Sequence, residues 1–570
     1  MPTLLDLEGT REATDEIRAV YDAMKHALTE ISLYTNKEWG NDASGLDRRG
    51  QFNAFDIQKG RFPRRKNVSS QGTLTVRGTH YLAQLVCSIP NTPEECKNVI
   101  VRVDRFGGAW RWTGFMHHWS AETIDGVDYV TMTFNSDEQI LQFLLCPPNP
   151  LLPIPVFQFP RDYFVFSPGC WGAAITFLLN VIRQEGNLWT LPDDPFDPEQ
   201  WVDSIDPSSW QVHVKCPSFF ADSSLWALYA SRMNTIDSVL ADGLDAGQLV
   251  LRHRRVFTDE GEQMSGLIGG VQPANGACVF WIDDESGFGE AGSYFTGVGG
   301  GFVRSLLTWL DDGVQSVLSV IDDNEELSPD EYWQNGWMRS LAAAPGLVVR
   351  DSYWNDLQSN VTYSPATATQ VIVGGDNPTA DALVKLMIES VGNLLGYVLL
   401  FGFDSLGDII SDVVMPFLVG TIAAWDQIEL GNRAGELGWA HLWEIFQSGA
   451  EQNSFSLSAV ATALGGVTDT EAKTAHTFVL DESTWVMPGL DYDIGTRMGS
   501  TSGALQRMGI DITFINQAEE DSLELDDKGS SKYLVKCGQN KAALSRAERD
   551  AQMFKKAMDR ISDIGVHLIQ

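Results

Sequence analysis

The chain has 570 residues, of which 44% are hydrophobic and 20% are charged, and its formal net charge at neutral pH is −36. The length predicts several domains, and the composition excludes a largely disordered chain. Because binding to nucleic acids and to anionic membranes depends on basic side chains, the acidic excess argues against both classes. The 7 cysteines include no CxxC pair and the N-terminus has no signal-peptide pattern, so we expect synthesis in a reducing cytoplasm.

Residues 1–72 are expected to form an N-terminal helix followed by a polar arm. Apolar side chains recur at helical spacing over 10–34, whereas 35–72 is polar. The polar stretch fits a linker, an arm that docks on a partner, or a solvated loop. Its basic residues include Arg48, Arg49, Arg61, Arg64, Arg65 and Lys66.

The segment 73–145 has the alternating pattern of β-strands and predicts a β-rich domain, either a barrel or a sandwich. Val99, Val101 and Val103 share one face of a strand, while Arg102 and Asp104 share the other. A Gly-Gly turn then predicts a hairpin. The expected strands are 73–78, 81–89, 98–105, 110–120 and 126–134.

A strap and a helix are expected over 146–215. The prolines of 146–165 exclude a helix and favour an extended strap. Ser167 and Pro168 are the expected cap and first residue of a helix that ends at Gly186. A second proline-rich stretch follows that helix.

The remaining sequence predicts four further regions. A mixed α/β domain is expected over 216–376, with a helix near 222–241 between strands at 211–215 and 247–257. An apolar helical insertion is expected over 377–450. Its charge-free runs are shorter than the roughly 20 residues that span a bilayer, so a helical hairpin buried in an assembly is favoured over a membrane contact. A C-terminal barrel-like domain is expected over 451–540, and a helix with a heptad seam over 541–570.

No motif for catalysis, a cofactor or a metal ion stands out. Gly287, Gly289 and Gly292 match GxGxxG, but the sequence delays any helix after them. His117 and His118 are expected to point to opposite faces of a strand and not to share an ion. We therefore expect no enzymatic activity, no cofactor and no metal. The 18 tryptophans favour protein interfaces, and the candidate interface residues are Trp110, Trp112, Trp119, Pro153, Pro155, Trp201, Phe554 and Met558.

Several segments resemble the tail-tip hub proteins of long-tailed phages that infect actinobacteria, a group that includes minor tail proteins and tail-associated lysin-type hubs. The most specific segment is 146–201, and the others are 101–120, 336–354, 437–450 and 492–499. The resemblance implies a multidomain, β-rich α+β fold with baseplate-hub-like β-barrel domains, a helical insertion and terminal helices.

The same resemblance implies a virion structural protein at the distal end of the tail. Such hubs form homotrimers that adapt the tail tube to the tip and close the channel until DNA ejection. The implied partners are the distal tail ring protein, the tape measure protein and other tip or fibre proteins; DNA would pass without specific binding, and contact with the host envelope would be transient. The alternatives are a receptor protein that binds cell-wall glycans, a peptidoglycan-degrading tail enzyme, or the distal tail ring protein itself.

Overall fold

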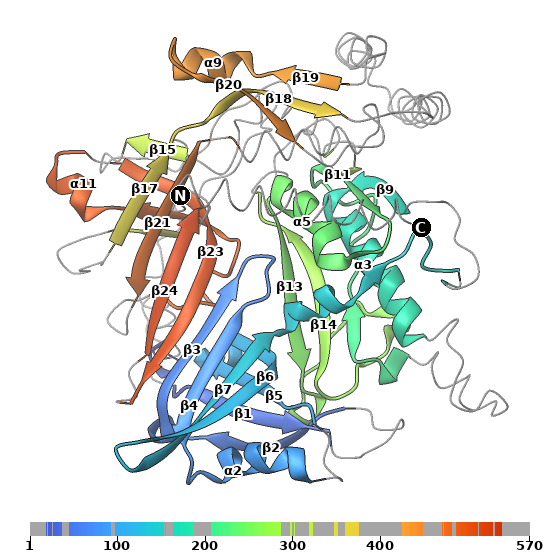
Figure 1. Cartoon of the computed structure of the whole chain (residues 1–570), viewed down its shortest axis with the longest axis vertical. Coiled ribbons are helices and arrows are strands. Elements are labelled where there is room, and N and C mark those ends of the chain that lie inside the picture. Colours follow the sequence, from blue (N-terminus) through green and yellow to red (C-terminus); the bar gives the residue numbers. More distant parts are fainter. Residues whose placement is uncertain are drawn as a thin grey trace, which may run out of the picture.

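The computed structural model describes residues 19, 21–24, 27–36, 45–92, 97–152, 154, 163–186, 207–286, 297–298, 301, 319–322, 347–350, 359–374, 425–447, 470, 472–480, 486–510, 512–527 and 531–538. The described strands form one large sheet and four smaller ones (Figure 1). The architecture of this part of the chain is β-rich, as the sequence predicts.

The large sheet joins segments from both ends of the sequence. β15 (Ser319–Asp322) pairs with β23 (Ile512–Asp526), and β22 (Arg497–Thr501) pairs with both β16 (Leu347–Val349) and β23. Across the main path, the strands are β17 (Ser359–Ser364), β21 (Lys473–Leu480), β24 (Ser531–Gly538), β23 (Ile512–Asp526), β3 (Ile57–Arg65), β4 (Gln71–Arg77), β7 (Val127–Ser136), β6 (Trp110–Ile124), β5 (Ile100–Arg105), β1 (Glu30–Thr35) and β2 (Asp47–Phe52).

This sheet corrects the prediction of two separate barrel domains. Strand β3 pairs with β4 on one side and with β23 on the other, so the regions 73–145 and 451–540 share one sheet. The path has two ends, β17 and β2, and the described strands contain no closed barrel. Alternation along a strand predicts which face is buried, but it leaves the neighbouring strand undetermined.

The N-terminal region also differs from the prediction. Residues 30–35 form β1, whose Ile31 and Leu33 enter the core, so the helix expected over 10–34 ends before Glu30. The expected polar arm contains β2 and β3, which are paired strands and not a loop. A polar segment is stable as a strand here because its neighbours satisfy the polar groups.

The segment expected as a strand at 81–89 is instead the helix α2 (Tyr81–Ser88). The His80 side chain accepts a hydrogen bond from the backbone N–H of Leu82 and caps the helix. Leu82, Ala83 and Val86 are buried, a spacing that places them on one face of a helix. A short apolar run fits either element, and in this case the local cap favours the helix.

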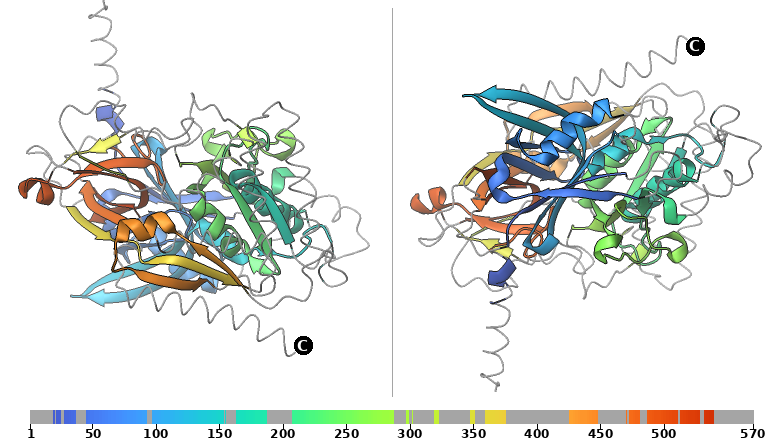
Figure 2. Two further views of the ribbon diagram at one scale, coloured as in Figure 1. Left: turned by 90° about the horizontal axis from the view of Figure 1, so that it is seen from above. Right: turned by 90° about the horizontal axis from the view of Figure 1, so that it is seen from below.

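A smaller α/β unit lies beside the large sheet (Figure 2). One apolar cluster contains the long helix α3 and strands of three small sheets. Their orders are β10-β14-β13, β11-β9 and β12-β8. The elements are β8 (Leu145–Cys146), β9 (Tyr163–Pro168), α3 (Gly169–Glu185), β10 (Val212–Val214), β11 (Trp226–Ser231), β12 (Asn234–Thr235), α5 (Ile236–Ala246), β13 (Leu249–Val256) and β14 (Ala277–Asp284).

Two boundaries in this unit differ from the prediction. Ser167 and Pro168 are the last two residues of strand β9, the helix begins at Gly169, and the first N–H groups of α3 are capped by side chains distant in sequence. Ser224 Oγ accepts from the Cys170 N–H at 3.0 Å, and Asp222 Oδ2 accepts from the Trp171 N–H at 2.7 Å. The helix expected near 222–241 begins only after β11 and β12, because that segment pairs with other strands.

A third region is the small mixed sheet of β18 (Ala368–Gly374), β19 (Trp425–Glu429) and β20 (Leu442–Gln447), with the helix α9 (Gly431–Leu437). The described part of the expected helical insertion is therefore largely β-sheet, while 375–424 lies outside the described residues. The predicted helix over 541–570 also lies outside them. The other described helices are α11 (Gly503–Arg507) and the 3-10 turns at Ala54–Asp56, Ile89–Asn91, Phe106–Gly108, Asp137–Phe143, Pro207–Ser209, Thr258–Glu260 and Ile268–Gly270.

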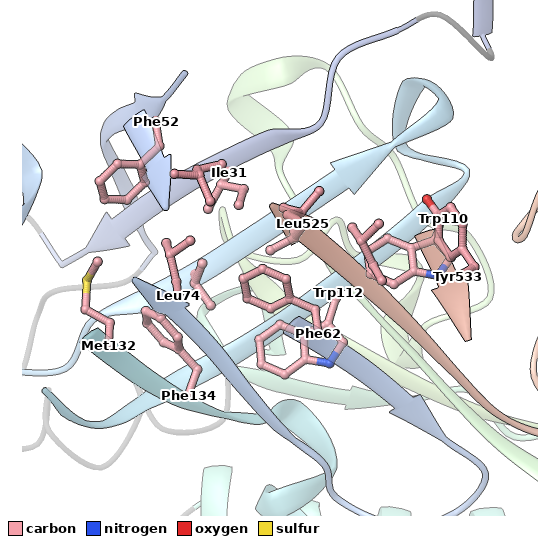
Figure 3. Packing of buried hydrophobic residues seen from close by; sticks show 14 of the residues in the cluster. Ile31, Phe52, Phe62, Leu74, Trp110, Trp112, Met132, Phe134, Leu525 and Tyr533 are labelled. Carbon is pink, nitrogen blue, oxygen red and sulfur yellow. The ribbon is translucent and has the colours of Figure 1, made fainter. Parts of the chain in front are cut away.

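The core of the large sheet contains residues from both ends of the chain (Figure 3). Phe62, Trp112 and Leu525 belong to one buried cluster, and the rings of Phe62 and Trp112 lie 5.3 Å apart. Burying a large apolar side chain stabilises a fold by about 1.5–3 kcal/mol. This core therefore fixes the N-terminal and C-terminal strands relative to each other.

Candidate interaction surface

The basic residues of β3 bind the acidic residues of β23. In the antiparallel register Arg64 faces Asp521 and Arg61 faces Glu524. Arg64 Nε lies 2.8 Å from Asp521 Oδ1, and a second nitrogen of the guanidinium contacts the other carboxylate oxygen. Arg61 and Glu524 form a looser pair at 3.7 Å, with both side chains about half exposed. The chain itself thus supplies an acidic partner for the segment expected to be a docking arm.

Asp521 lies at the centre of a buried network. Its side chain is fully buried, and it accepts a hydrogen bond from Trp110 Nε1 at 3.2 Å. Burial raises the pKa of Asp521, and the adjacent Arg64 guanidinium opposes that rise. Arg64 also reaches Asp493 at 2.9 Å, and Asp493 pairs in turn with Arg252 on β13 at 2.5 Å. The network therefore connects the large sheet to the α/β unit.

A second set of ion pairs connects the β5–β6 hairpin to the segment that follows β13. Arg111 lies 2.7 Å from Asp104 and 2.9 Å from Glu262, and Arg102 lies 2.8 Å from Glu260. Burial raises the pKa of Glu262, but the Arg111 guanidinium outweighs burial and holds this pKa at about 2. The Glu262 carboxylate is therefore charged at neutral pH, and the ion pairs of Glu260 and Glu262 hold the two units in one arrangement.

The predicted interface tryptophans have different environments. Trp110 and Trp112 are buried in the chain's own core, and Trp112 Nε1 donates to the Pro63 carbonyl at 2.8 Å. Neither indole lies on the surface of this fold, which corrects the expectation that they contact another chain. Trp119 is partly buried against the same core. The other candidates lie outside the described residues, namely Pro153, Pro155, Trp201, Phe554 and Met558.

The two adjacent histidines also differ from the prediction. A β-bulge between Met116 and His118 interrupts the register of β6 with β7. It brings the Nδ1 atoms of His117 and His118 within 2.7 Å of each other, although neighbouring residues of a regular strand point to opposite faces.

Within the described ranges, no group of three or more His, Cys, Asp and Glu side chains is placed to hold a metal ion. None of the helices that the structure describes has the length and apolar character of a membrane-spanning segment.

The most exposed tryptophans that the structure describes are not among the predicted interface residues. Trp439 is 99% exposed and Trp443 is 75% exposed, and Leu442 between them is half exposed. Gly438, with a φ of 77°, turns the chain between α9 and β20, which is the last strand on one side of its sheet. The segment 437–450 carries part of the family resemblance, but its sequence pattern alone does not distinguish a buried indole from an exposed one.

A second exposed feature is the outer part of the β6–β7 hairpin, which projects beyond the body of the molecule (Figures 1 and 2). Strand β5 pairs with β6 only as far as Phe115, whereas β6 continues to Ile124. The two-residue turn Asp125-Gly126 has positive φ at both positions, as type I′ hairpins require. Ile124 and Val127 flank the turn and are 48% and 42% exposed.

The family model described as Siphovirus ReqiPepy6 Gp37-like protein matches residues 41–539. The minor tail protein Gp28 of Mycobacterium phage L5 is 28% identical over 486 residues, which cover 76% of this chain and 80% of that protein. The minor tail protein Gp28 of Mycobacterium phage D29 is 28% identical over 487 residues with the same coverage. Among solved structures, the 43 kDa tail protein of prophage MuSo2 from Shewanella oneidensis aligns with 10% identity and a TM-score of 0.38, over 90% of this chain and 99% of that chain. The chain belongs to the family of Siphovirus ReqiPepy6 Gp37-like proteins.

Proposed function

We propose that this chain is a structural minor tail protein of a siphovirus and forms the central hub at the distal tip of the tail. The observation that carries the proposal is the family match over residues 41–539, together with two mycobacteriophage relatives that are named minor tail proteins. The large sheet and its buried ion pairs support the proposal, because a hub must keep its shape while neighbours bind. The exposed Trp439 just before β20, the exposed Trp443 on β20 and the projecting hairpin offer surfaces for those neighbours.

Immunogold electron microscopy of virions, with an antibody against this chain, tests the location. We expect gold at the distal tail tip. Label along the tail or at the head would contradict the hub position, and absence of the chain from virions would overturn the structural role altogether.

In the proposed hub, three copies adapt the tail tube to the tip and contact the distal tail ring protein, the tape measure protein and other tip or fibre proteins. Cryo-electron microscopy of tail tips tests this symmetry. Density with threefold symmetry supports the hub, whereas density with sixfold symmetry would identify a ring protein instead.

The hub would also close the channel until DNA leaves. The net charge of −36 supports a lumen that repels the DNA backbone, so that DNA passes without specific binding. Replacing several luminal acidic residues with lysine should slow ejection, and unchanged ejection kinetics would contradict this role.

The apolar segment 379–426 is proposed to help close the tip or to contact the host envelope transiently. Its deletion should impair assembly or infection.

A receptor role is the second candidate, and the exposure of Trp439 and Trp443 favours it. Exposed indoles present flat apolar faces on which sugar rings stack. Purified chain should then bind host cell walls, and soluble cell-wall sugar should compete. Equal binding by the Trp443→Ala variant would contradict this role for the β20 surface.

A further inference from the structure

Among the described residues, no strand pairs with one backbone edge of the outer part of β6. Beyond Phe115, the Met116 N–H still donates to the Val99 carbonyl at 2.8 Å, but from His117 to Ile124 the described residues place no strand on this side. At about 3.3 Å per residue, this edge is roughly 25 Å long. Such an edge is a template for another strand, and a two-stranded ribbon is marginally stable by itself.

The register shows which backbone groups point outward. Ile124 and Val127 flank a two-residue turn and therefore form a hydrogen-bonded pair. Because hydrogen-bonded and non-hydrogen-bonded pairs alternate in an antiparallel ladder, Trp119, Ala121 and Thr123 direct their N–H and C=O groups to this edge. The outward N–H and C=O groups of these three alternate residues can form hydrogen bonds with one side of an extended peptide.

The charge of the ribbon indicates the chemistry of its partner. Glu122, Asp125 and Asp128 are exposed on or beside the turn. No Lys or Arg occurs between Arg111 and Arg161, so no ammonium or guanidinium group of the ribbon offsets these acids. A second copy of this chain, with its net charge of −36, is a poor match for an acidic ribbon.

We propose that the edge of β6 from His117 to Ile124 binds an extended, lysine- or arginine-bearing segment of a different virion tail protein as an added strand. Main-chain hydrogen bonds give the affinity, and the acidic and apolar tip selects a basic partner strand. This inference rests on the proposed function in one respect, namely that the partner belongs to the same virion.

Photo-crosslinking in assembled virions tests the proposal. A benzophenone amino acid replaces Ile124 in one preparation and the exposed Asp242 of α5 in the control, and mass spectrometry identifies the attached peptides. We expect position 124, and not 242, to attach to a basic peptide of another tail protein. Attachment to a second copy of this chain, to an acidic peptide, or to nothing would overturn the inference. Absence of the chain from virions would instead overturn the proposed function.

Variants of the edge separate strand addition from side-chain contact. Ala121→Pro removes an outward N–H, and we expect it to reduce the crosslink at position 124 by about tenfold, whereas Ala121→Val keeps the N–H and the yield. Glu122→Lys should reduce the yield without altering the backbone. Equal yields in Ala121→Pro and Ala121→Val would overturn strand addition. If Ala121→Pro fails to fold, an unchanged crosslink yield in Glu122→Lys would still overturn the proposal that the partner strand is basic.

Discussion

Two tryptophans of β6 lie at the junction of β3 with β23, and two others lie on and just before the outer strand β20, yet the environments of the two pairs are opposite. Trp110 and Trp112 are buried, and their indole N–H groups donate to Asp521 and to a backbone carbonyl. Trp439 and Trp443 are 99% and 75% exposed. The difference teaches that tryptophan content indicates aromatic contacts without showing whether they lie inside the chain or on its surface.

The largest effect is expected from Asp521→Ala. The variant leaves the buried Arg64 without its closest carboxylate and the Trp110 N–H without its acceptor. Removing one partner of a buried ion pair destabilises a protein by about 3–5 kcal/mol. Urea unfolding followed by tryptophan fluorescence measures the change.

The matched control is Glu524→Ala in the same strand pair. Its ion pair with Arg61 is half exposed, and exposed pairs contribute about 0–1 kcal/mol. If both variants lost the same stability, burial of the Arg64–Asp521 pair would not be the cause.

The sequence predicts which face of a strand is buried better than it predicts which strand lies beside it, and β3 and β23 show why. The alternation of Val99, Val101 and Val103 correctly predicts that these side chains share one face, and all three lie in the apolar core of the large sheet, because that pattern is local. The charges of Arg64 and Asp521 are equally visible, but they are separated by 457 residues and no local pattern joins them. The expected docking arm is therefore a strand of the chain's own sheet.

An acid-sensitive stability is expected from the buried His476. Burial lowers the pKa of this imidazole to about 4, and its Nδ1 lies 2.5 Å from Ser500 Oγ. The unfolded chain binds the proton more readily than the folded chain does. The stability that the neutral, buried His476 allows is therefore fully present above about pH 6.5 and is lost as the pH falls toward 4. The free energy of unfolding should fall by about 3 kcal/mol over this range. Unfolding curves of wild type and His476→Gln across this range measure it, and identical pH slopes would contradict the prediction.

A smaller effect is expected from Trp112→Phe. The variant retains an aromatic ring but removes the indole N–H that donates to the Pro63 carbonyl, which still accepts a hydrogen bond from Ser70 Oγ. Because the carbonyl keeps one partner, we expect the loss of a single hydrogen bond, about 1 kcal/mol in the free energy of unfolding. A loss below 0.5 kcal/mol would show that the hydrogen bond adds little to the packing of the ring.

The smallest effect on folding, and the largest on assembly, is expected from Trp443→Ala. The side chain is 75% exposed, so its removal should change the free energy of unfolding by less than about 0.5 kcal/mol. A tryptophan that is buried when a partner binds typically contributes 2 kcal/mol or more to that contact, which corresponds to roughly a 30-fold loss of affinity. Infectious particle yield and urea unfolding of the same variant measure both quantities.

The two results together distinguish an interface from a tolerated exposed side chain. Normal unfolding with a reduced particle yield identifies β20 as a surface that another molecule covers, in contrast to the buried tryptophans of the large sheet. Normal unfolding with a normal yield would leave Trp443 without a role in assembly. A loss of stability comparable to that of Trp112→Phe would show that the indole packs against its own chain, and the contrast between the two regions would then fail.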